Sequence, residues 1–495
     1  MRVADLIVLV VYVAAVVALG CSLARRSGTP KGFMTAGGRL GGWAVGLSLF
    51  GTFLSSNTFL GVPGKAFAED WNSWVFSLSL PIAAWVASRW FVPFYREAGH
   101  LSAYEHFEAR FGRWARTYAV VCYLLTQLAR VGSILFGVAL ALHALTGWPL
   151  AAIIVATGAL VTLYTLIGGI EAVIWTDVVQ SVVLTAGAVL VVATLVAGTP
   201  GGLSGILAAA GEAGKTGLGS FEPEFGASTF WVVLLYGLFI NLNNFGIDQS
   251  YVQRYHVARD LAEARRSVWL AAILYVPISF AFFFIGTGLW VYYSGRPDAL
   301  ATVGATAGVE AGGDHVFPHF IVNELPTGIS GLLIAALLAA AMSSIDTSLN
   351  SSATVLLEDV WTPYVRPSPT ESATMRVLHG ATLLVGTLGT LTALAMIGVQ
   401  SLLDAWWTLS GVFAGGLLGL FLLGMLVRRA DRAAALAAVA VGVAVILWMT
   451  FPAYLPPGLQ SPFHSNMITV VGTLSLFLTG LVVTSWRTRS RALSR

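Results

Sequence analysis

The feature that most constrains this chain is a series of long apolar runs separated by short polar segments. An α-helix crosses the roughly 30 Å hydrocarbon core of a bilayer with about 20 residues. Because lipid offers no hydrogen bonds, each span has to satisfy its own backbone, which favours helices. The sequence therefore predicts an all-α polytopic membrane protein with about thirteen transmembrane helices. They lie at about residues 3–24, 42–65, 72–95, 115–143, 150–168, 173–198, 229–252, 267–293, 319–356, 374–398, 403–426, 433–451 and 467–486.

Composition supports a membrane class and excludes several functions. Hydrophobic residues make up 57% of the chain and charged residues only 10%, whereas about a quarter of an average soluble protein is charged. The longest segments between predicted spans, about 199–228 and 294–318, are too short for a soluble catalytic module. No GxxxxGK[ST] phosphate loop is present. We therefore predict that the protein is neither an ATP-driven pump nor any other enzyme.

Basic residues predict how the chain is oriented. Loops on one side of the predicted membrane hold 21 Lys and Arg residues, and the opposite loops hold only Arg2, Lys65, Lys215 and Arg296. Because Lys and Arg accumulate on the cytoplasmic side, we expect a plasma membrane protein, in the inner membrane if bacterial, with its N-terminus outside and its C-terminus inside. This asymmetry accounts for the net charge of +3 without a nucleic-acid partner.

The first apolar run has an alternative interpretation as a signal peptide. Met1 and Arg2 form a short basic start, and small residues occur near Ala18 to Gly20. We favour a retained helix, because Arg25 and Arg26 directly after the run would anchor its inner end.

Two predicted spans carry the signature of a broken helix. Residues 48–64 read SLFGTFLSSNTFLGVPG, and residues 241–249 read NLNNFGIDQ. Glycine, proline and amide side chains interrupt the apolar pattern in both. Paired discontinuous helices in corresponding positions are typical of transporters whose binding site lies between the two breaks.

A third span is rich in hydroxyl groups. Residues 339–354 read AAAMSSIDTSLNSSAT, and Ser343, Asp346 or Thr347, Asn350 and Thr354 recur at the spacing of one helical face. Serine and threonine in spans often bond only to their own backbone. A cluster that faces a broken helix is better interpreted as a cage of hard oxygen donors, which suits a hard cation.

Asp177 places a carboxylate inside the span at 173–198 and needs a positive partner. Arg130 is the basic residue at membrane depth that could supply it. Arg130 could therefore form a structural ion pair with Asp177, or it could line the path of a solute.

Several motifs together resemble the sodium/solute symporter family, which includes the sodium/glucose cotransporters and has the LeuT-type five-plus-five inverted-repeat fold. The similar segments are SAYEHFEARFG (102–112), GGIEAVIWTDVVQ (168–180), DQSYVQRYHVARDLAEARRS (248–267) and GLLIAALLAAAMSSIDTSLNSSATVLLEDV (331–360). The resemblance implies a ten-helix transport core at 37–426 with broken core helices one and six. Residues 1–36 would hold an extra N-terminal helix and the first cytoplasmic loop. Residues 427–495 would hold two C-terminal helices and a short tail.

The resemblance also implies a sodium site. The positions that match the family's main site are Gly51, Leu54, Ala340, Ser343 and Ser344. Some members hold a second sodium ion at positions that match Asp177, Ser343, Asp346 and Thr347. Because Asp346 is a carboxylate here, three roles remain open for it: strengthening that second site, taking a proton, or pairing with a nearby donor.

The solute is less well defined. In sugar-transporting relatives a Gln, a Tyr and a second Gln contact the sugar, but the matching positions here are Thr58, Asn244 and approximately Trp407. Glucose or galactose specificity therefore cannot be transferred. The candidate solute-binding residues are Asn57, Thr58, Arg130, Asn241, Asn243, Asn244 and Trp407.

The predicted function is sodium-coupled symport of a small polar organic solute, of the sugar, sialic acid or monocarboxylate type, by alternating access. Na⁺, the solute and the lipid bilayer are the expected partners, and no obligatory protein partner is indicated. A proton-coupled symporter of the same fold, and a solute sensor that does not transport, remain the alternatives.

Overall fold

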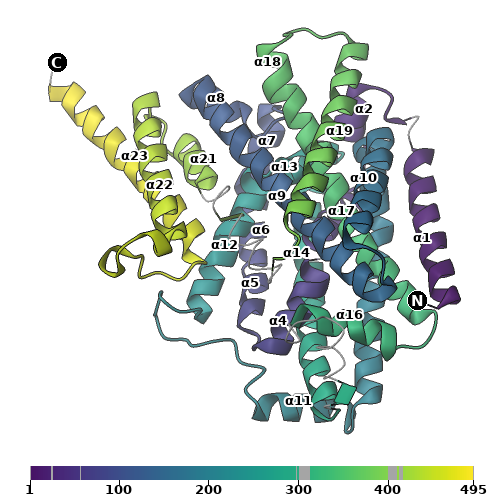
Figure 1. The fold of residues 1–495 in the computed structure, drawn as a ribbon. Helices are drawn as coiled ribbons and strands as arrows, with labels where there is room; N and C mark the ends of the chain where they lie inside the picture. Colours follow the sequence, from purple (N-terminus) through teal and green to yellow (C-terminus); the bar gives the residue numbers. More distant parts are fainter. Residues whose placement is uncertain are drawn as a thin grey trace.

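The structure is a computed structural model that describes residues 2–23, 26–55, 57–296, 298–299, 313–399, 410–411 and 416–493. Within these residues the chain is helical, and an isolated bridge between Leu40 and Ala258 is the nearest approach to a strand. Helix α1 (Val3–Ser22) lies at one edge of the bundle, and the pair α22 (Arg432–Thr450) and α23 (Met467–Leu493) lies at the other (Figure 1). The all-α prediction is confirmed.

Ten helical segments of the described chain are long and apolar enough to cross a membrane, or eleven if one bent pair counts as a span. Besides α1, α22 and α23 they are the run Asn72–Ala98, α9 (Arg113–Thr146), α10 (Leu150–Gly198), α12 (Phe230–Ile247), α14 (Leu261–Ser294), α17 (Ile329–Val355) with its extension to Tyr364, and α19 (Glu371–Ala395).

The predicted count of thirteen stays a prediction. Helix α10 contains 49 residues, which at 1.5 Å per residue gives about 74 Å, more than twice the bilayer core. At Gly169 its φ is 58°, and this non-helical residue kinks the helix between the two spans predicted at 150–168 and 173–198. The span predicted at 403–426 lies partly outside the described residues, which contain its end as α21 (Leu417–Leu426).

Both predicted helix breaks are present. Helix α3 (Gly42–Phe53) ends where Leu54 turns to ψ 89°, and the chain continues through a π-helical turn, η3 (Asn57–Gly61), into α4 (Val62–Ala68) at a bend of 60°. Helix α12 ends at Ile247, and Asp248 is extended before α13 (Gln249–Val257) begins. The second break therefore lies two residues after Gly246, the glycine of the predicted motif.

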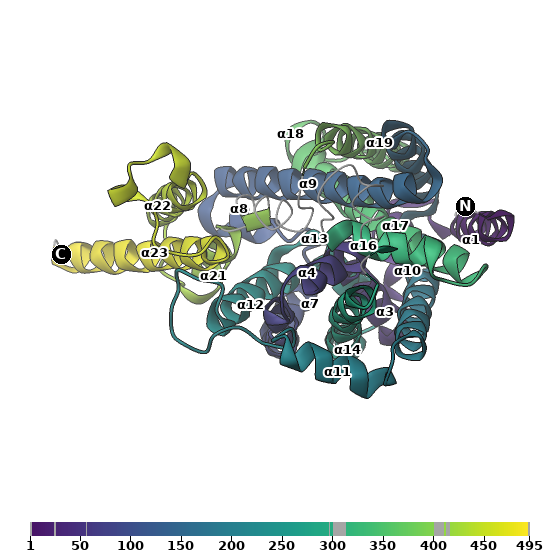
Figure 2. The same ribbon diagram turned by 60° about the horizontal axis from the view of Figure 1, so that its bottom comes forward.

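Helix α17 forms the centre of the molecule. Every residue from Leu333 to Val355 is buried, and the helix packs against α1, α3, α9, α10 and α19. Figure 2 shows it enclosed by these elements. Its hydroxyl-rich stretch therefore faces protein on all sides rather than lipid.

Short elements close the two ends of the bundle (Figure 1). One end holds α2 (Pro30–Thr35), η2 (Ala36–Gly38), α7 (Val92–Ala98), α8 (Glu105–Phe111), η6 (Leu356–Trp361) and α18 (Thr362–Tyr364). The other holds η4 (Asn72–Trp74), α11 (Gly202–Glu212) and α16 (Gly313–Asn323), while α5 (Val75–Leu78), α6 (Leu80–Val86) and η5 (Ala87–Phe91) build the third predicted span. Two 3-10 turns, η7 (Pro452–Tyr454) and η8 (Pro457–Leu459), connect α22 to α23.

Candidate functional site

Three of the five predicted sodium ligands, Gly51, Ala340 and Ser343, meet where α17 crosses the end of α3. Ser343 donates a hydrogen bond from Oγ to the carbonyl oxygen of Gly51 at 3.1 Å, and its own helix supplies the Ala340 carbonyl oxygen at 3.4 Å. The Gly51 carbonyl oxygen belongs to the last turn of α3, where it also accepts a hydrogen bond from the Leu54 N–H at 3.1 Å. The next hydroxyl, Ser344 Oγ, is buried and has no hydrogen-bond partner among the described residues. The structure thus brings carbonyl and hydroxyl oxygens of two elements together.

Two further features explain this close approach. A Cβ atom added at Gly51 would lie 2.9 Å from Ser181 Oγ of α10, so a larger residue there would require the Ser181 side chain to move. Leu54, the fifth predicted ligand, is completely buried at the break itself. The end of α3 therefore packs between α10 and α17 at the point where the helix breaks.

Two residues of the second predicted cation site, Asp177 and Thr347, contact a residue that was not expected there, Arg254 of α13. Its guanidinium group is fully buried and donates from Nη2 to Asp177 Oδ2 at 3.0 Å and to Thr347 Oγ1 at 2.7 Å. Nε donates to Ser48 Oγ at 2.8 Å, and Nη1 donates to the Ser250 carbonyl oxygen at 2.7 Å. One guanidinium thus connects α3, α10, α13 and α17.

The proposed pairing of Arg130 with Asp177 is therefore wrong. Arg254 follows the span predicted at 229–252 and is one of the 21 basic residues counted in the predicted cytoplasmic loops. In the structure the chain re-enters a helix at Gln249 and carries Arg254 into the interior. The sequence signal for this pairing was Asp177 itself, because a carboxylate inside a span needs a buried positive partner.

Asp346 has one clear partner. Tyr164 of α10 donates a hydrogen bond from its hydroxyl group to Asp346 Oδ2 at 2.6 Å. Of the three roles left open for this carboxylate, pairing with a neighbouring donor is thus observed. The other two stay predictions.

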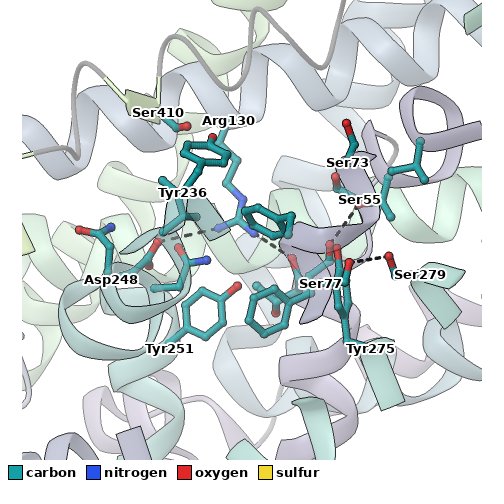
Figure 3. A pocket seen from close by; sticks show the side chains of 18 of the residues that line it. Ser55, Ser73, Ser77, Arg130, Tyr236, Asp248, Tyr251, Tyr275, Ser279 and Ser410 are labelled. Atoms are coloured by element: carbon teal, nitrogen blue, oxygen red, sulfur yellow. Dashed lines mark hydrogen bonds and ion pairs between the residues drawn. The ribbon is translucent and has the colours of Figure 1, made fainter. Parts of the chain in front are cut away.

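A cavity of about 130 Å³ lies between the two broken helices (Figure 3). Phe53 at the first break packs its ring against Phe245 and Tyr251 at the second break, with ring centroids 5.7 and 5.1 Å apart. Residues from α5, α9, α12 and α14 complete the wall. Residues at both helix breaks thus line one cavity, as the paired broken-helix motifs predict.

The predicted solute-binding residues divide into three groups. Thr58, Arg130, Asn243 and Asn244 line the cavity. Asn241 is not among the lining residues, and its side chain instead donates to Ser79 Oγ at 3.0 Å. The Asn57 side chain and Trp407 lie outside the described residues.

Sequence reasoning missed most of the polar wall. Figure 3 shows Arg130 and Asp248 toward one end of the cavity, with Ser55, Ser77, Ser279 and Tyr275 toward the other. Isolated hydroxyl groups in a span resemble ordinary helix-packing residues, so no local pattern separated these from the rest. Further polar lining residues are Thr52, Ser73, Thr126, Tyr236, Tyr251 and Ser410.

Arg130 is the cation of this cavity. Its Nη2 donates to the Thr52 carbonyl oxygen of α3 at 2.8 Å, and its Nη1 lies 3.9 Å from Asp248 Oδ2. Asp248 is held independently, because it accepts from the Ser250 N–H at 2.8 Å and from Gln127 Nε2 at 3.3 Å. The guanidinium is therefore fixed at the first break while only loosely paired with the acid.

Comparison with known proteins agrees with this arrangement. The family model described as the sodium:solute symporter family matches residues 33–442. The sodium/sialic acid symporter NanT of Aliivibrio fischeri is 33% identical over 95% of this chain and 92% of its own length. For SiaT of Proteus mirabilis the identity is 34% over 94% and 93%. The human sodium-coupled monocarboxylate transporter 1 is 31% identical over 89% of this chain and 72% of its own.

Solved structures give the same result. A substrate-bound, outward-open Na⁺-coupled sialic acid symporter, whose structure reveals a novel Na⁺ site, superposes with a TM-score of 0.90 at 33% identity over 98% of both chains. The nucleobase-cation-symport-1 transporter Mhp1, at 18% identity and a TM-score of 0.59, shares the fold. The chain therefore belongs to the sodium:solute symporter family and is a sodium-coupled secondary transporter of LeuT-type fold.

Proposed function

We propose that the transported solute is a small organic acid and that Arg130 binds its carboxylate. The observation that carries this proposal is the guanidinium group in the cavity between the two broken helices. Arginine presents paired N–H donors that match the geometry of a carboxylate. Its present acidic neighbour, Asp248, is 3.9 Å away and so leaves donor capacity for a ligand.

The opposite end of the cavity favours a polyhydroxylated acid, with a sialic acid as the first candidate. Ser77 and Ser279 share a hydrogen bond of 2.7 Å there, and Thr58 and Tyr275 add two further hydroxyl groups to the wall. Asn243 Oδ1 has no hydrogen-bond partner among the described residues. These groups donate and accept, as sugar hydroxyls and an N-acetyl group require.

The relatives support the acid class. Two are named as symporters of sialic acid and one as a transporter of monocarboxylates. The shared feature of these solutes is a carboxylate, the group that Arg130 would bind. A simple monocarboxylate is therefore the second candidate.

The co-transported ion would bind at the crossing of α3 and α17. Its ligands are the carbonyl oxygens of Gly51, Leu54 and Ala340 and the hydroxyls of Ser343 and Ser344. The Ser344 hydroxyl, buried without a partner among the described residues, supports this assignment. Sodium holds the two helices together and thereby favours the outward-open state, which raises solute affinity by linkage.

The energetics fit uphill transport. One sodium ion entering down the membrane potential releases about 2.3 kcal/mol per 100 mV. A tenfold sodium gradient adds about 1.4 kcal/mol. Because a carboxylate anion moving inward costs the same amount, about 2.3 kcal/mol per 100 mV, one sodium ion supports a gradient of about tenfold, and each further ion adds several hundredfold.

The first experiment is thermal unfolding of the purified protein in detergent, in sodium and in matched choline, with N-acetylneuraminic acid, lactate and galactose. A ligand that binds only the folded state raises the unfolding midpoint. We expect N-acetylneuraminic acid to raise it in sodium and not in choline, with galactose inactive. A shift with galactose and none with either acid would refute the acid assignment. Equal shifts in both salts would instead favour proton coupling.

Removing one hydroxyl should weaken sodium coupling. We expect Ser343→Ala or Ser344→Ala to raise the sodium concentration that half-activates solute uptake by about tenfold, because each variant loses one oxygen ligand. Expression and the unfolding midpoint without sodium should stay nearly unchanged, since alanine fits the helix. Ser348→Ala is the matched control, because this hydroxyl bonds to the Ser344 carbonyl oxygen of its own helix. Wild-type sodium dependence in both site variants would exclude the site.

The membrane placement is also part of the proposal. We infer a transport core at 37–426, an extra helix within 1–36 and two helices within 427–495. The bias of Lys and Arg favours the plasma or inner membrane with the N-terminus outside and the C-terminus inside. Uptake by proteoliposomes would separate this transporter from a sensor that binds without transport.

A further inference from the structure

Asp248 is a second charged residue of the solute cavity, and the proposed function leaves it without a role. Among the described lining residues, Arg130 and Asp248 are the charged ones. The Asp248 side chain is only 9% exposed, and Figure 3 shows its carboxylate directed toward Arg130. A carboxylate next to Arg130 repels an anionic solute. Its presence therefore has to be offset by a favourable contact with that solute.

The structural role of Asp248 accounts for one of its two carboxylate oxygen atoms. Oδ1 caps α13 by accepting a hydrogen bond from the Ser250 N–H at 2.8 Å. A neutral asparagine or serine caps a helix about as well as an aspartate does. The cap therefore explains neither the charge of the residue nor its second oxygen atom.

The second oxygen atom, Oδ2, lacks a close donor. Among the described residues it accepts one hydrogen bond, from Gln127 Nε2 at 3.3 Å, which is longer than most N–H···O bonds. Arg130 Nη1 lies 3.9 Å away, beyond hydrogen-bond distance. Because buried charged oxygen atoms are normally paired, Oδ2 is positioned to accept a donor from a bound solute.

The spacing of Arg130 and Asp248 suits two adjacent groups of one small solute. A solute carboxylate bound to Nη1 would place the substituent of its neighbouring carbon beside Oδ2. A hydroxyl group at that position supplies one donor, whereas a hydrogen atom leaves Oδ2 unpaired. An ammonium group would bring three donors, although two of the roughly four lone-pair positions of this carboxylate are already used. A single hydroxyl group is therefore the better match.

We propose that the cavity selects a 2-hydroxy acid and that Asp248 is a specificity-determining residue, which accepts the hydrogen bond of the 2-hydroxyl group. The proposal rests on the proposed function, because Arg130 has to hold the carboxylate. It narrows the solute from any small organic acid to one with a hydroxyl on the carbon next to the carboxylate. N-acetylneuraminic acid, through its anomeric hydroxyl, and lactate both meet this condition, whereas propionate does not.

Isothermal titration of the purified full-length protein in saturating sodium tests this proposal with acids that differ by one hydroxyl group. The pairs are N-acetylneuraminic acid with its 2-deoxy analogue, and lactate with propionate. The wild type should bind the hydroxy acid about tenfold more tightly, because the deoxy acid leaves Oδ2 without a donor. Asp248→Asn should reduce this preference to less than about threefold, mainly by strengthening the deoxy acid, since the repelling charge is gone.

Asp260→Asn is the matched control. Asp260 also caps a helix, because it accepts a hydrogen bond from the Glu263 N–H at 2.9 Å at the start of α14, but its side chain is exposed and lies outside the cavity. This variant should keep the wild-type preference for the hydroxy acid.

The outcomes separate this inference from the proposed function. If the wild type binds neither hydroxy acid, both are refuted. Equal binding of hydroxy and deoxy acids by the wild type would overturn this inference alone and leave the role of Arg130 intact. A full preference in Asp248→Asn would overturn the role of Asp248, and tighter binding of alanine than of lactate would replace the hydroxyl by an ammonium group. Because the comparison of acids on the wild type needs no variant, the test stays decisive if Asp248→Asn fails to fold.

Discussion

Replacing Arg254 by leucine is expected to cause the largest loss of stability of any single change in the transport core. The guanidinium is fully buried and makes hydrogen bonds to α3, α10, α17 and its own helix. Leucine would leave Asp177 charged and without a cation in the interior, which costs about 3–5 kcal/mol. The unfolding midpoint in detergent, without sodium or solute, measures the effect.

Two comparisons make this prediction specific. Arg266→Leu removes an arginine whose pairing with Glu263 is exposed to solvent, so we expect no measurable change. Combining Arg254→Leu with Asp177→Leu should recover part of the lost stability, because no isolated charge remains. Equal losses for Arg254→Leu and Arg266→Leu would show that the buried ion pair is not a stabilising centre.

The second large effect concerns the solute. Arg130→Gln should weaken binding of the acid about a hundredfold, which corresponds to about 2.7 kcal/mol, because the carboxylate loses its charged partner in a partly desolvated cavity. Asp248 keeps its bonds to Ser250 and Gln127, so the break in core helix six should stay intact. Isothermal titration with N-acetylneuraminic acid in saturating sodium measures the loss.

Controls on the protein and on the solute separate a loss of carboxylate binding from a loss of folding. The sodium-induced shift of the unfolding midpoint should persist in Arg130→Gln, since the sodium ligands belong to α3 and α17. Arg89→Gln, at an exposed arginine, should bind the acid normally. The methyl ester of the acid should bind the wild type weakly and should discriminate little between the wild type and Arg130→Gln. Unchanged binding of the free acid by Arg130→Gln would end the carboxylate assignment.

The sequence by itself determined the class, the fold family and the two helix breaks. The length of an apolar run predicts a membrane-spanning helix, because lipid offers no hydrogen bonds to the polypeptide backbone. The breaks at 48–64 and 241–249 were visible because glycine, proline and amides interrupt an otherwise apolar run. The hydroxyl stripe was equally clear, because oxygen donors at one helical spacing are rare in such a run.

Only the tertiary structure decided how the polar groups pair. Arg254 appeared to belong to a loop, and its burial beside Asp177 depends on how α13 turns back into the bundle. The hydroxyls of Ser77 and Ser279 meet across 202 residues of sequence, and the Tyr164 hydroxyl reaches Asp346 across 182. The physical reason is that apolar periodicity is a local property of the chain, whereas the partner of a buried charge or hydroxyl depends on which distant helices pack against it.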